Sequence, residues 1–273
     1  NITRYHQGKI VIMDLHTDQI IKQYYLKPSD VTPNSLLANI AVDVSKYDCD
    51  GAFAYLPDLG GYGVVVYNLR ADDSWRVSHN YFFLESLHGE FDIGGQRFQW
   101  NDGVFSLALT DVKSDGFRNV YFHSMAGIHL FSVSTRILRD RQLATRSYHG
   151  DDFKVVAKRR DNAHTCSSDL HQQSGVLFLT LISQNALGCW NTNKEPEIEN
   201  FDIVYKDDQN FIYPADVRIY KDDVMVLSNT MPVQLYSRLN YDKVNFRVWI
   251  FKVADAVKDT ACSSVRYHKF GYH

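Results

Sequence analysis

A strand pattern that occurs four times along the chain limits the fold more than any other feature. Each unit has a strand, a turn, a strongly apolar strand, a short polar or glycine-containing loop and another apolar strand. The units begin at Ala41, Phe105, Cys166 and Ala215, at intervals of 64, 61 and 49 residues. Four-stranded sheets repeated at this spacing predict an all-β protein, a β-propeller of four-stranded blades.

Two other architectures fit the same pattern. The units share little sequence identity, so what repeats is the order of strands and turns, and the units are not a tandem duplication. A long antiparallel sandwich or two small β domains would also present many strands separated by turn residues. The composition suits all three, because 45% of the 273 residues are hydrophobic and 14% are aromatic, enough for a large core of strand-forming side chains.

The N-terminal segment predicts half of a further blade. Residues 9–15 and 19–26 form a hairpin pattern that resembles two outer strands without their inner strands, which makes about four and a half blades. An open stack of this kind exposes two sheet faces. We therefore expect a fragment of a closed ring, with the missing part before Asn1. The alternative is a complete five-bladed ring in which residues 264–273 supply the inner strands. We assign residues 1–262 to one incomplete propeller and residues 263–273 to an irregular tail.

The longer connections have local signals of their own. Residues 73–83 read as an outermost strand, and residues 88–100 contain a Gly-Gly turn between two short strands. Residues 134–148 fit either a short helix or an extended outer strand.

Charge and hydropathy exclude two classes of partner. A net charge of −3 argues against a general nucleic-acid surface. No run of about eighteen apolar residues is present, so no membrane span is expected. The basic residues 158–160 precede Asp161 and are expected in a solvated loop. Asn1 begins an Asn-Ile-Thr tripeptide, which is a glycosylation acceptor pattern.

The four cysteines leave two alternatives. Cys49, Cys166, Cys189 and Cys262 form no CxxC motif, so zinc and thioredoxin chemistry have no support. A bridge between Cys189, in a late strand, and Cys262, after the last strand, would tie the C-terminal segment to the preceding blade and imply an oxidising compartment. Four free thiols are the alternative.

The loops at one end of the predicted propeller contain the candidate ligand-binding residues. Propellers place ligands at one end of the central channel, where the loops leading into the inner strands meet those joining the second and third strands. Apolar walls with a few amides and a carboxylate suit a small aromatic molecule carrying a cationic amine. The alternative is that Asp and Asn only cap turns. The candidates are Asn39, Asp102, Phe105, Ala215, Asp216, Asn229 and Met231.

Motifs for other chemistry are absent. The sequence has no GxSxG, HExxH or P-loop motif and no paired Cys-His signature, so no nucleophile is assigned and no cofactor is expected. His123 and His129 lie on neighbouring predicted strands, but no third ligand is evident, so we expect no metal site.

Several stretches in fixed order resemble the insect yellow and major royal jelly proteins. The likeness covers almost the whole chain and includes a cysteine near the C-terminus, in DTAC (259–262). The other matching stretches are DSWRV (73–77), QWNDGVFSLAL (99–109), HSMAGIHLFSVSTRIL (123–138), NALGCWN (185–191), IYPADV (212–217), VLSNTMP (226–232) and NFRVW (245–249).

The resemblance implies a secreted six-bladed propeller, and therefore an extracellular protein. It implies that Cys189 pairs with Cys262 and that Cys49 pairs with an upstream cysteine, whereas Cys166 matches no family cysteine. Salivary relatives bind biogenic amines through an Asn that matches Asn229, a hydroxyl residue where Ala215 stands and an aromatic residue where Met231 stands. Only the Asn is kept, so the chain is more similar to the cuticle and pigmentation branch.

The resemblance implies a small catechol- or indole-derived ligand and leaves three roles open. The first is conversion of dopachrome in melanin formation, a proton shift that needs a base and a donor to the developing oxyanion. Asp102 or Asp216 is the candidate base, with Asn229 or Asn39 as the donor. The second role is a non-catalytic extracellular protein that binds biogenic amines. The third is a structural or storage protein.

Overall fold

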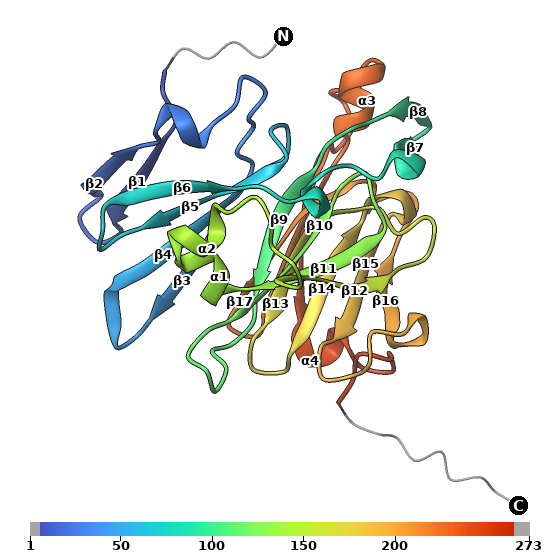
Figure 1. Cartoon of the computed structure of the whole chain (residues 1–273). Helices are drawn as coiled ribbons and strands as arrows, with labels where there is room; N and C mark the ends of the chain where they lie inside the picture. The colour runs from blue at the N-terminus through green and yellow to red at the C-terminus, as the bar shows by residue number, and fades with distance from the viewer. Residues whose placement is uncertain (1–5, 265–273) are drawn as a thin grey trace, which may run out of the picture.

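The computed structural model describes residues 6–264, which form a β-propeller of four blades (Figure 1). The sequence prediction of the fold is confirmed. Every blade is antiparallel, and its strands follow one another in chain order from the axis outwards. Blade 1 contains β3 (Ala41–Ser45), β4 (Asp48–Asp58), β5 (Gly63–Asn68) and β6 (Asp73–Val77), and blade 2 contains β9 (Val104–Leu109), β10 (Asn119–Ser124), β11 (His129–Ser134) and β12 (Phe153–Lys158). Blade 3 contains β13 (Thr165–His171), β14 (Val176–Leu181), β15 (Ala186–Asn191) and β16 (Phe201–Lys206), and blade 4 contains β17 (Pro214–Tyr220), β18 (Asp223–Asn229) and β19 (Phe246–Lys252).

Two hairpins and several short helices complete the fold. The hairpin of β7 (Glu90–Ile93) and β8 (Gln96–Gln99) turns at Gly94 and Gly95, whose φ angles of 60° and 75° favour glycine. The helices are α1 (Thr135–Arg139), α2 (Arg141–Ala144), α3 (Met231–Tyr236) and α4 (Val253–Ala256), with single 3-10 turns at Pro28–Asp30, Asn80–Phe82, Ser86–His88, Ile182–Gln184 and Ile198–Asn200. No helix in residues 6–264 is both long enough and apolar enough to cross a bilayer.

Burial along the strands follows from their place in the stack. All six residues of β14 (VLFLTL) are buried, because blades 2 and 4 cover the two faces of blade 3. Strand β19 (FRVWIFK) instead alternates exposed and half-buried side chains, as expected when a sheet is covered on one face only. Separate apolar clusters lie between blades 1 and 2, 2 and 3, and 3 and 4, so the core is divided into sectors.

The two ends of the stack expose apolar side chains. The hairpin of β1 (Lys9–Asp14) and β2 (Gln19–Tyr25) packs on blade 1, with the Tyr24 and Tyr67 rings 4.6 Å apart. Its Ile21 is 66% exposed, and on blade 4 Val248 and Ile250 are 68% and 64% exposed. The expectation that an open stack exposes two sheet faces is therefore confirmed for the described residues.

A buried ion cluster joins blades 1 and 2. Asp43 of β3 is 1% exposed and accepts hydrogen bonds from Arg118 (Nε to Oδ1, 2.8 Å), Arg139 (Nε to Oδ2, 3.0 Å) and the Tyr55 hydroxyl (3.1 Å). Each partner comes from a different segment of the chain, so the carboxylate ties these segments together.

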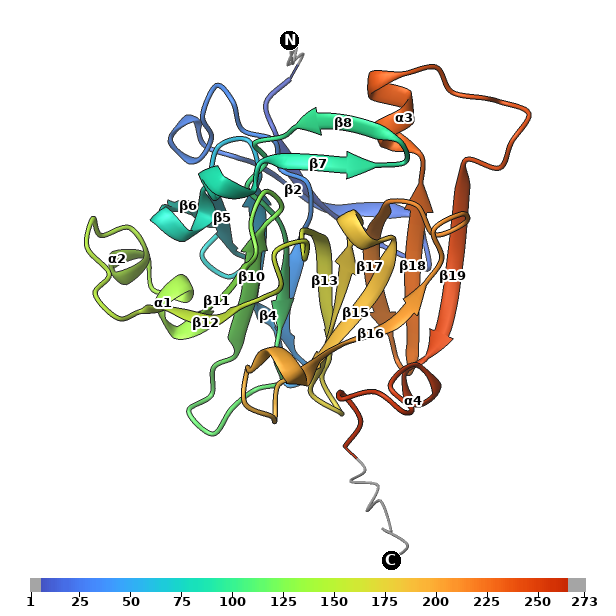
Figure 2. The same cartoon turned by 90° about the vertical axis from the view of Figure 1, so that its right-hand side faces the viewer.

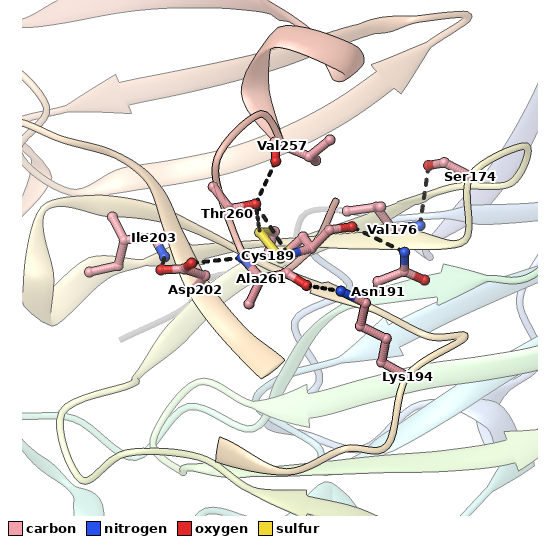
Figure 3. The surroundings of a disulfide bond; sticks show 11 residues. Ser174, Val176, Cys189, Asn191, Lys194, Asp202, Ile203, Val257, Thr260 and Ala261 are labelled. Carbon is pink, nitrogen blue, oxygen red and sulfur yellow. Dashed lines mark hydrogen bonds between the residues drawn. A yellow bond between two sulfur atoms is a disulfide. The ribbon is translucent and has the colours of Figure 1, made fainter. Parts of the chain in front are cut away.

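A disulfide between Cys189 and Cys262 joins the C-terminal segment to β15 (Figure 3). This is the pair that the resemblance implies. The Asn191 amide donates to the Cys262 carbonyl (3.0 Å), and the Ala261 amide donates to Asp202 (2.8 Å). Among the described residues the Cys49 and Cys166 thiols are free, the first exposed and the second buried. Asn1 and residues 265–273 of the predicted tail lie outside the described residues.

The structure settles the alternatives for residues 134–148 and corrects the prediction for residues 158–160. Residues 134–148 hold the short helices α1 and α2, so the helical alternative is correct and the outer strand β12 comes later. The expectation that residues 158–160 form a solvated loop is wrong for Arg159, which is 3% exposed. Its Nε donates to the Ile128 carbonyl (3.1 Å) and its Nη1 to the Thr165 hydroxyl.

Candidate functional site

The β7–β8 hairpin lies across one end of the propeller (Figure 2). An apolar cluster joins it to the residues of the blades. Its side chains come from blades 2, 3 and 4 and from the hairpin, because the inner strands and their connecting loops meet there. It contains three of the candidates predicted from sequence, Phe105, Ala215 and Met231, all partly buried. The buried members of the cluster are Phe91, Ile93, Met125, Ala126, Cys166, Ile182 and Tyr213.

Two sulfur atoms and a tyrosine hydroxyl contact one another in this cluster. The Cys166 sulfur lies 3.8 Å from the Tyr213 hydroxyl, which donates to the Met125 sulfur at 4.0 Å. Burial raises the pKa of the Cys166 thiol, and the charges of Asp216 and Asp102 raise it further. Burial, Cys166 and Asp102 also raise the pKa of Tyr213. Both groups are therefore protonated at neutral pH, and Cys166 is not a nucleophile.

Asp216 is fully engaged by neighbouring groups. Its Oδ1 accepts hydrogen bonds from the Ser167 hydroxyl (2.6 Å) and the Val217 amide (3.0 Å). Its Oδ2 lies 3.5 Å from Nε of Arg218. These contacts fix the orientation of the Asp216 carboxylate.

Asp102 lies in a different environment. It precedes β9, and its backbone carbonyl accepts a hydrogen bond from the Ala126 amide (3.1 Å). Its carboxylate forms no hydrogen bond or ion pair with any residue in the described part of the chain, and burial alone raises its pKa to about 6. An unpaired carboxyl group with a pKa near neutrality is typical of a general acid or base.

The two aspartates approach the same group. Both charges act on the Cys166 thiol, and Asp102 also acts on Tyr213. Contacts agree with this: Asp102 bonds through its backbone to Ala126 of the apolar cluster, and Asp216 bonds Ser167, which follows Cys166.

The two candidate asparagines lie at the margin. Asn39 Oδ1 accepts from the Ile40 amide (2.7 Å) and from Arg218, so a short chain of polar contacts links Asn39 to Asp216. Asn229 Oδ1 accepts from the Met231 amide (2.9 Å) at the start of α3. Asn229 also lines a pocket of about 510 Å³ whose lining contains neither Asp102 nor Asp216.

The two histidines considered for a metal do not act together. His123 is fully buried beside Ser168 (Nε2 to Oγ, 3.1 Å), and burial lowers its pKa well below the usual value. His129 contacts Glu85 instead (Nδ1 to Oε2, 2.9 Å). No cluster of His, Cys, Asp and Glu suited to a metal occurs in residues 6–264.

Sequence reasoning missed a buried polar group beside the axis. Arg159 and His123 lie close enough for the guanidinium charge to lower the pKa of the imidazole further. Arg159 Nη2 and His123 Nδ1 have no hydrogen-bond partner among the described residues. The only sequence signal was the basic triplet, which gave no indication that its central residue points inwards.

The site thus combines a carboxyl group of raised pKa, Asp102, with a hydrogen-bonded carboxylate, Asp216. The Phe105 and Met231 side chains add apolar surface.

Comparisons with known proteins agree on one family. The sequence model for the major royal jelly proteins matches residues 1–262. The chain is 43% identical to "Protein yellow" of Drosophila subobscura over 265 residues, which is 96% of this chain and 46% of that protein. It is 41% identical to "Protein yellow" of Drosophila melanogaster over 263 residues, 95% of this chain and 48% of that protein. The chain thus spans about half the length of these curated relatives.

Solved structures match only distantly. Hydrazine synthase of Kuenenia stuttgartiensis aligns with a TM-score of 0.46 at 12% identity, covering 85% of this chain and 50% of that one. Virginiamycin B lyase of Staphylococcus aureus aligns with a TM-score of 0.42 at 12% identity, covering 93% of this chain and 81% of that one.

Proposed function

Because the chain belongs to the major royal jelly protein family, as a yellow-type propeller protein, we propose that it acts on a small catechol- or indole-derived molecule at the axis. The proposed role is pigmentation, through conversion of dopachrome in melanin formation. The observation that carries the proposal is the partly buried Asp102 carboxylate, which lacks a partner in the described chain and whose charge, like that of Asp216, raises the pKa of the Cys166 thiol.

The reaction requires a proton shift and no net oxidation or reduction. A base removes a proton from carbon, the electron pair moves into the ring system, and a proton is delivered to the oxygen that becomes negative. Asp102 is the proposed base, because its carboxylate is not held by other donors. The raised pKa makes it a stronger base than an ordinary aspartate.

Asp216 is the proposed positioning residue. Ser167, the Val217 amide and Arg218 already engage its carboxylate, so its orientation is fixed. Its fixed charge can orient a cationic ring nitrogen over the apolar surface of Phe105. The Asn39 amide, which Arg218 links to Asp216, is the proposed donor to oxygen, because Asn229 lines a pocket that contains neither aspartate.

The decisive assay follows loss of dopachrome absorbance with the wild-type protein, Asp102→Asn and Asp216→Asn. General-base catalysis contributes about 10²–10⁴-fold, so Asp102→Asn should lose most of the activity. Asp216→Asn should raise KM more than it lowers kcat. Asp92→Asn, on the exposed β7–β8 hairpin, is the matched control and should keep full activity. Equal rates for the wild type and Asp102→Asn would remove Asp102 from the mechanism.

Non-catalytic binding of an amine is the second candidate. An unpaired carboxylate beside aromatic and sulfur side chains also suits a protonated aromatic amine. Calorimetry against dopamine, serotonin and dopachrome separates the candidates, because saturable heat without turnover favours binding. Absence of both binding and turnover would favour a structural or storage role.

An extracellular location is part of the proposal. The Cys189–Cys262 disulfide supports it, because such bonds persist in oxidising compartments.

A further inference from the structure

The pocket beside α3 is lined by cations and amides. It has a volume of about 510 Å³ and lies where β18 and β19 meet the connection that follows α3. Figure 2 shows this connection projecting beyond the top of blade 4. The described residues that line the pocket include no Asp or Glu. The polar groups used in the argument are Asn229, Arg238, Asn240, Lys243, Asn245 and Arg247.

Three positive charges in the lining lack counter-ions. Arg238, Lys243 and Arg247 form no ion pair with any residue of the described chain. The nearest recorded contact of Arg247 is neutral, from its Nη1 to the Val244 carbonyl (3.2 Å). Three unpaired cations around one pocket contrast with the net charge of −3 for the whole chain. The local potential therefore favours an anion.

The side-chain oxygens of three asparagines in the pocket already accept hydrogen bonds. Asn229 Oδ1 accepts from the Met231 amide (2.9 Å), and Asn240 Oδ1 accepts from the Asp242 amide (2.9 Å). Asn245 Oδ1 accepts from the Thr230 hydroxyl (3.0 Å). The Nδ2 groups of Asn229 and Asn240 form no hydrogen bond within residues 6–264, so both remain as free donors. These three side-chain oxygens are therefore already engaged, whereas two of the NH2 groups are not.

The pocket has a defined frame. Asn245 Nδ2 donates to the Asn240 and Lys243 carbonyls, each at 2.9 Å, which holds the connection in a closed turn. The Tyr236 ring of α3 stacks on Phe98 of β8 with centroids 4.5 Å apart. The connection is thereby closed on itself, and α3 is held against the β7–β8 hairpin.

We propose that this pocket binds a small, multiply charged oxyanion, such as a phosphate, sulfate or polycarboxylate group. Guanidinium, ammonium and amide N–H groups form charge-assisted hydrogen bonds with such oxygens. A protonated amine would meet three like charges there, so this site is distinct from the proposed channel site at Asp102. The inference does not depend on the proposed function.

Calorimetric titration of the whole protein with inorganic phosphate, sulfate and citrate tests the proposal. Chloride balances the ionic strength in every titration. At least one of the three should bind saturably, and the affinity should fall steeply as salt rises. The three titrations distinguish an inorganic anion from an organic polycarboxylate. Absence of saturation by about 10 mM for all three would overturn the proposal, since such affinity is negligible.

Charge variants locate the site. Arg238→Gln and Lys243→Gln remove exposed cations that make no ion pair, so both variants should fold, as thermal melting would verify. Each should weaken binding by at least about tenfold, because a charge-assisted contact is lost. Arg97→Gln, which removes an exposed arginine on β8, is the control and should bind as the wild type does. Equal affinity in all four proteins would contradict the proposal, and Asp102→Asn should leave it unchanged.

Discussion

Ser167 donates a 2.6 Å hydrogen bond from its Oγ to Oδ1 of Asp216, although 49 residues separate them in the chain. The contact joins β13 of blade 3 to β17 of blade 4 near the axis. Asp102, from the loop before β9 of blade 2, acts on the adjacent Cys166. Residues from three blades therefore meet at one end of the propeller, and this convergence is the basis of the proposed site.

Removal of the Asp43 charge should strongly destabilise the protein. Asp43→Asn would leave the guanidinium groups of Arg118 and Arg139 without their buried carboxylate. Breaking a buried pair typically costs about 3–5 kcal/mol of unfolding free energy. Urea denaturation measures the loss. Asp92→Asn removes an exposed pair with Arg97 and should cost less than about 1 kcal/mol. Similar losses for both variants would contradict the role of the cluster.

Loss of the disulfide should also lower stability. Cys189 and Cys262 are 73 residues apart, so reduction frees a long loop in the unfolded state. Cys262→Ser should reduce the unfolding free energy by about 2–5 kcal/mol. The control is Cys49→Ser, at an exposed free thiol, which should have little effect. Denaturation without reductant compares the three proteins, and an unchanged midpoint for Cys262→Ser would oppose this prediction.

The sector packing predicts opposite outcomes for two valines of blade 4. Val226 of β18 is fully buried, whereas Val248 of β19 is 68% exposed. Val226→Ala should cost about 2 kcal/mol, because it leaves a cavity against blade 3. Val248→Ala should change the free energy of unfolding by less than about 0.5 kcal/mol. A large loss for Val248→Ala would indicate that its face is covered in solution.

The raised pKa of Asp102 makes stability depend on pH. The folded pKa is about 6, against an ordinary aspartate value of 3.8, so between these values the folded state binds more protons. Stability from this group is therefore present below about pH 4 and lost as pH rises through about 6. Asp102→Asn should be about 1–2 kcal/mol more stable than the wild type at pH 7.5 and similar to it at pH 4, allowing for partial exposure. Thermal melts at the two pH values check this, and an equal difference at both would exclude the effect.

The strand pattern predicts the blades well because burial on both faces requires long apolar strands such as β14. The hairpin turn at Gly94 and Gly95 is also predictable from the local sequence, because its positive φ angles favour glycine. Helix α3 was not predicted. Its six residues follow the SNT loop, where Asn229 makes a local hydrogen bond to the Met231 amide. The Thr230 hydroxyl instead bonds Asn245, which only the folded chain brings close.

The candidate site was predictable only in part. Loop position within the repeat identifies Asp102 and Asp216, but not that one is engaged and the other unpaired. That difference arises largely from Ser167, which reaches Asp216 only because blades 3 and 4 pack together, whereas Arg218 lies two residues along the same strand. The burial of Arg159 has the same origin, since its acceptors Ile128 and Thr165 lie on other segments.

The central claim is that Asp102 acts as the base at the propeller axis. The most direct test is the pH dependence of kcat/KM for dopachrome loss by the wild-type protein. The free enzyme must have Asp102 ionised, so kcat/KM should rise about tenfold per pH unit below about pH 6 and level off above it. A profile that is flat between pH 4.5 and 7.5, or that persists unchanged in Asp102→Asn, would contradict the account.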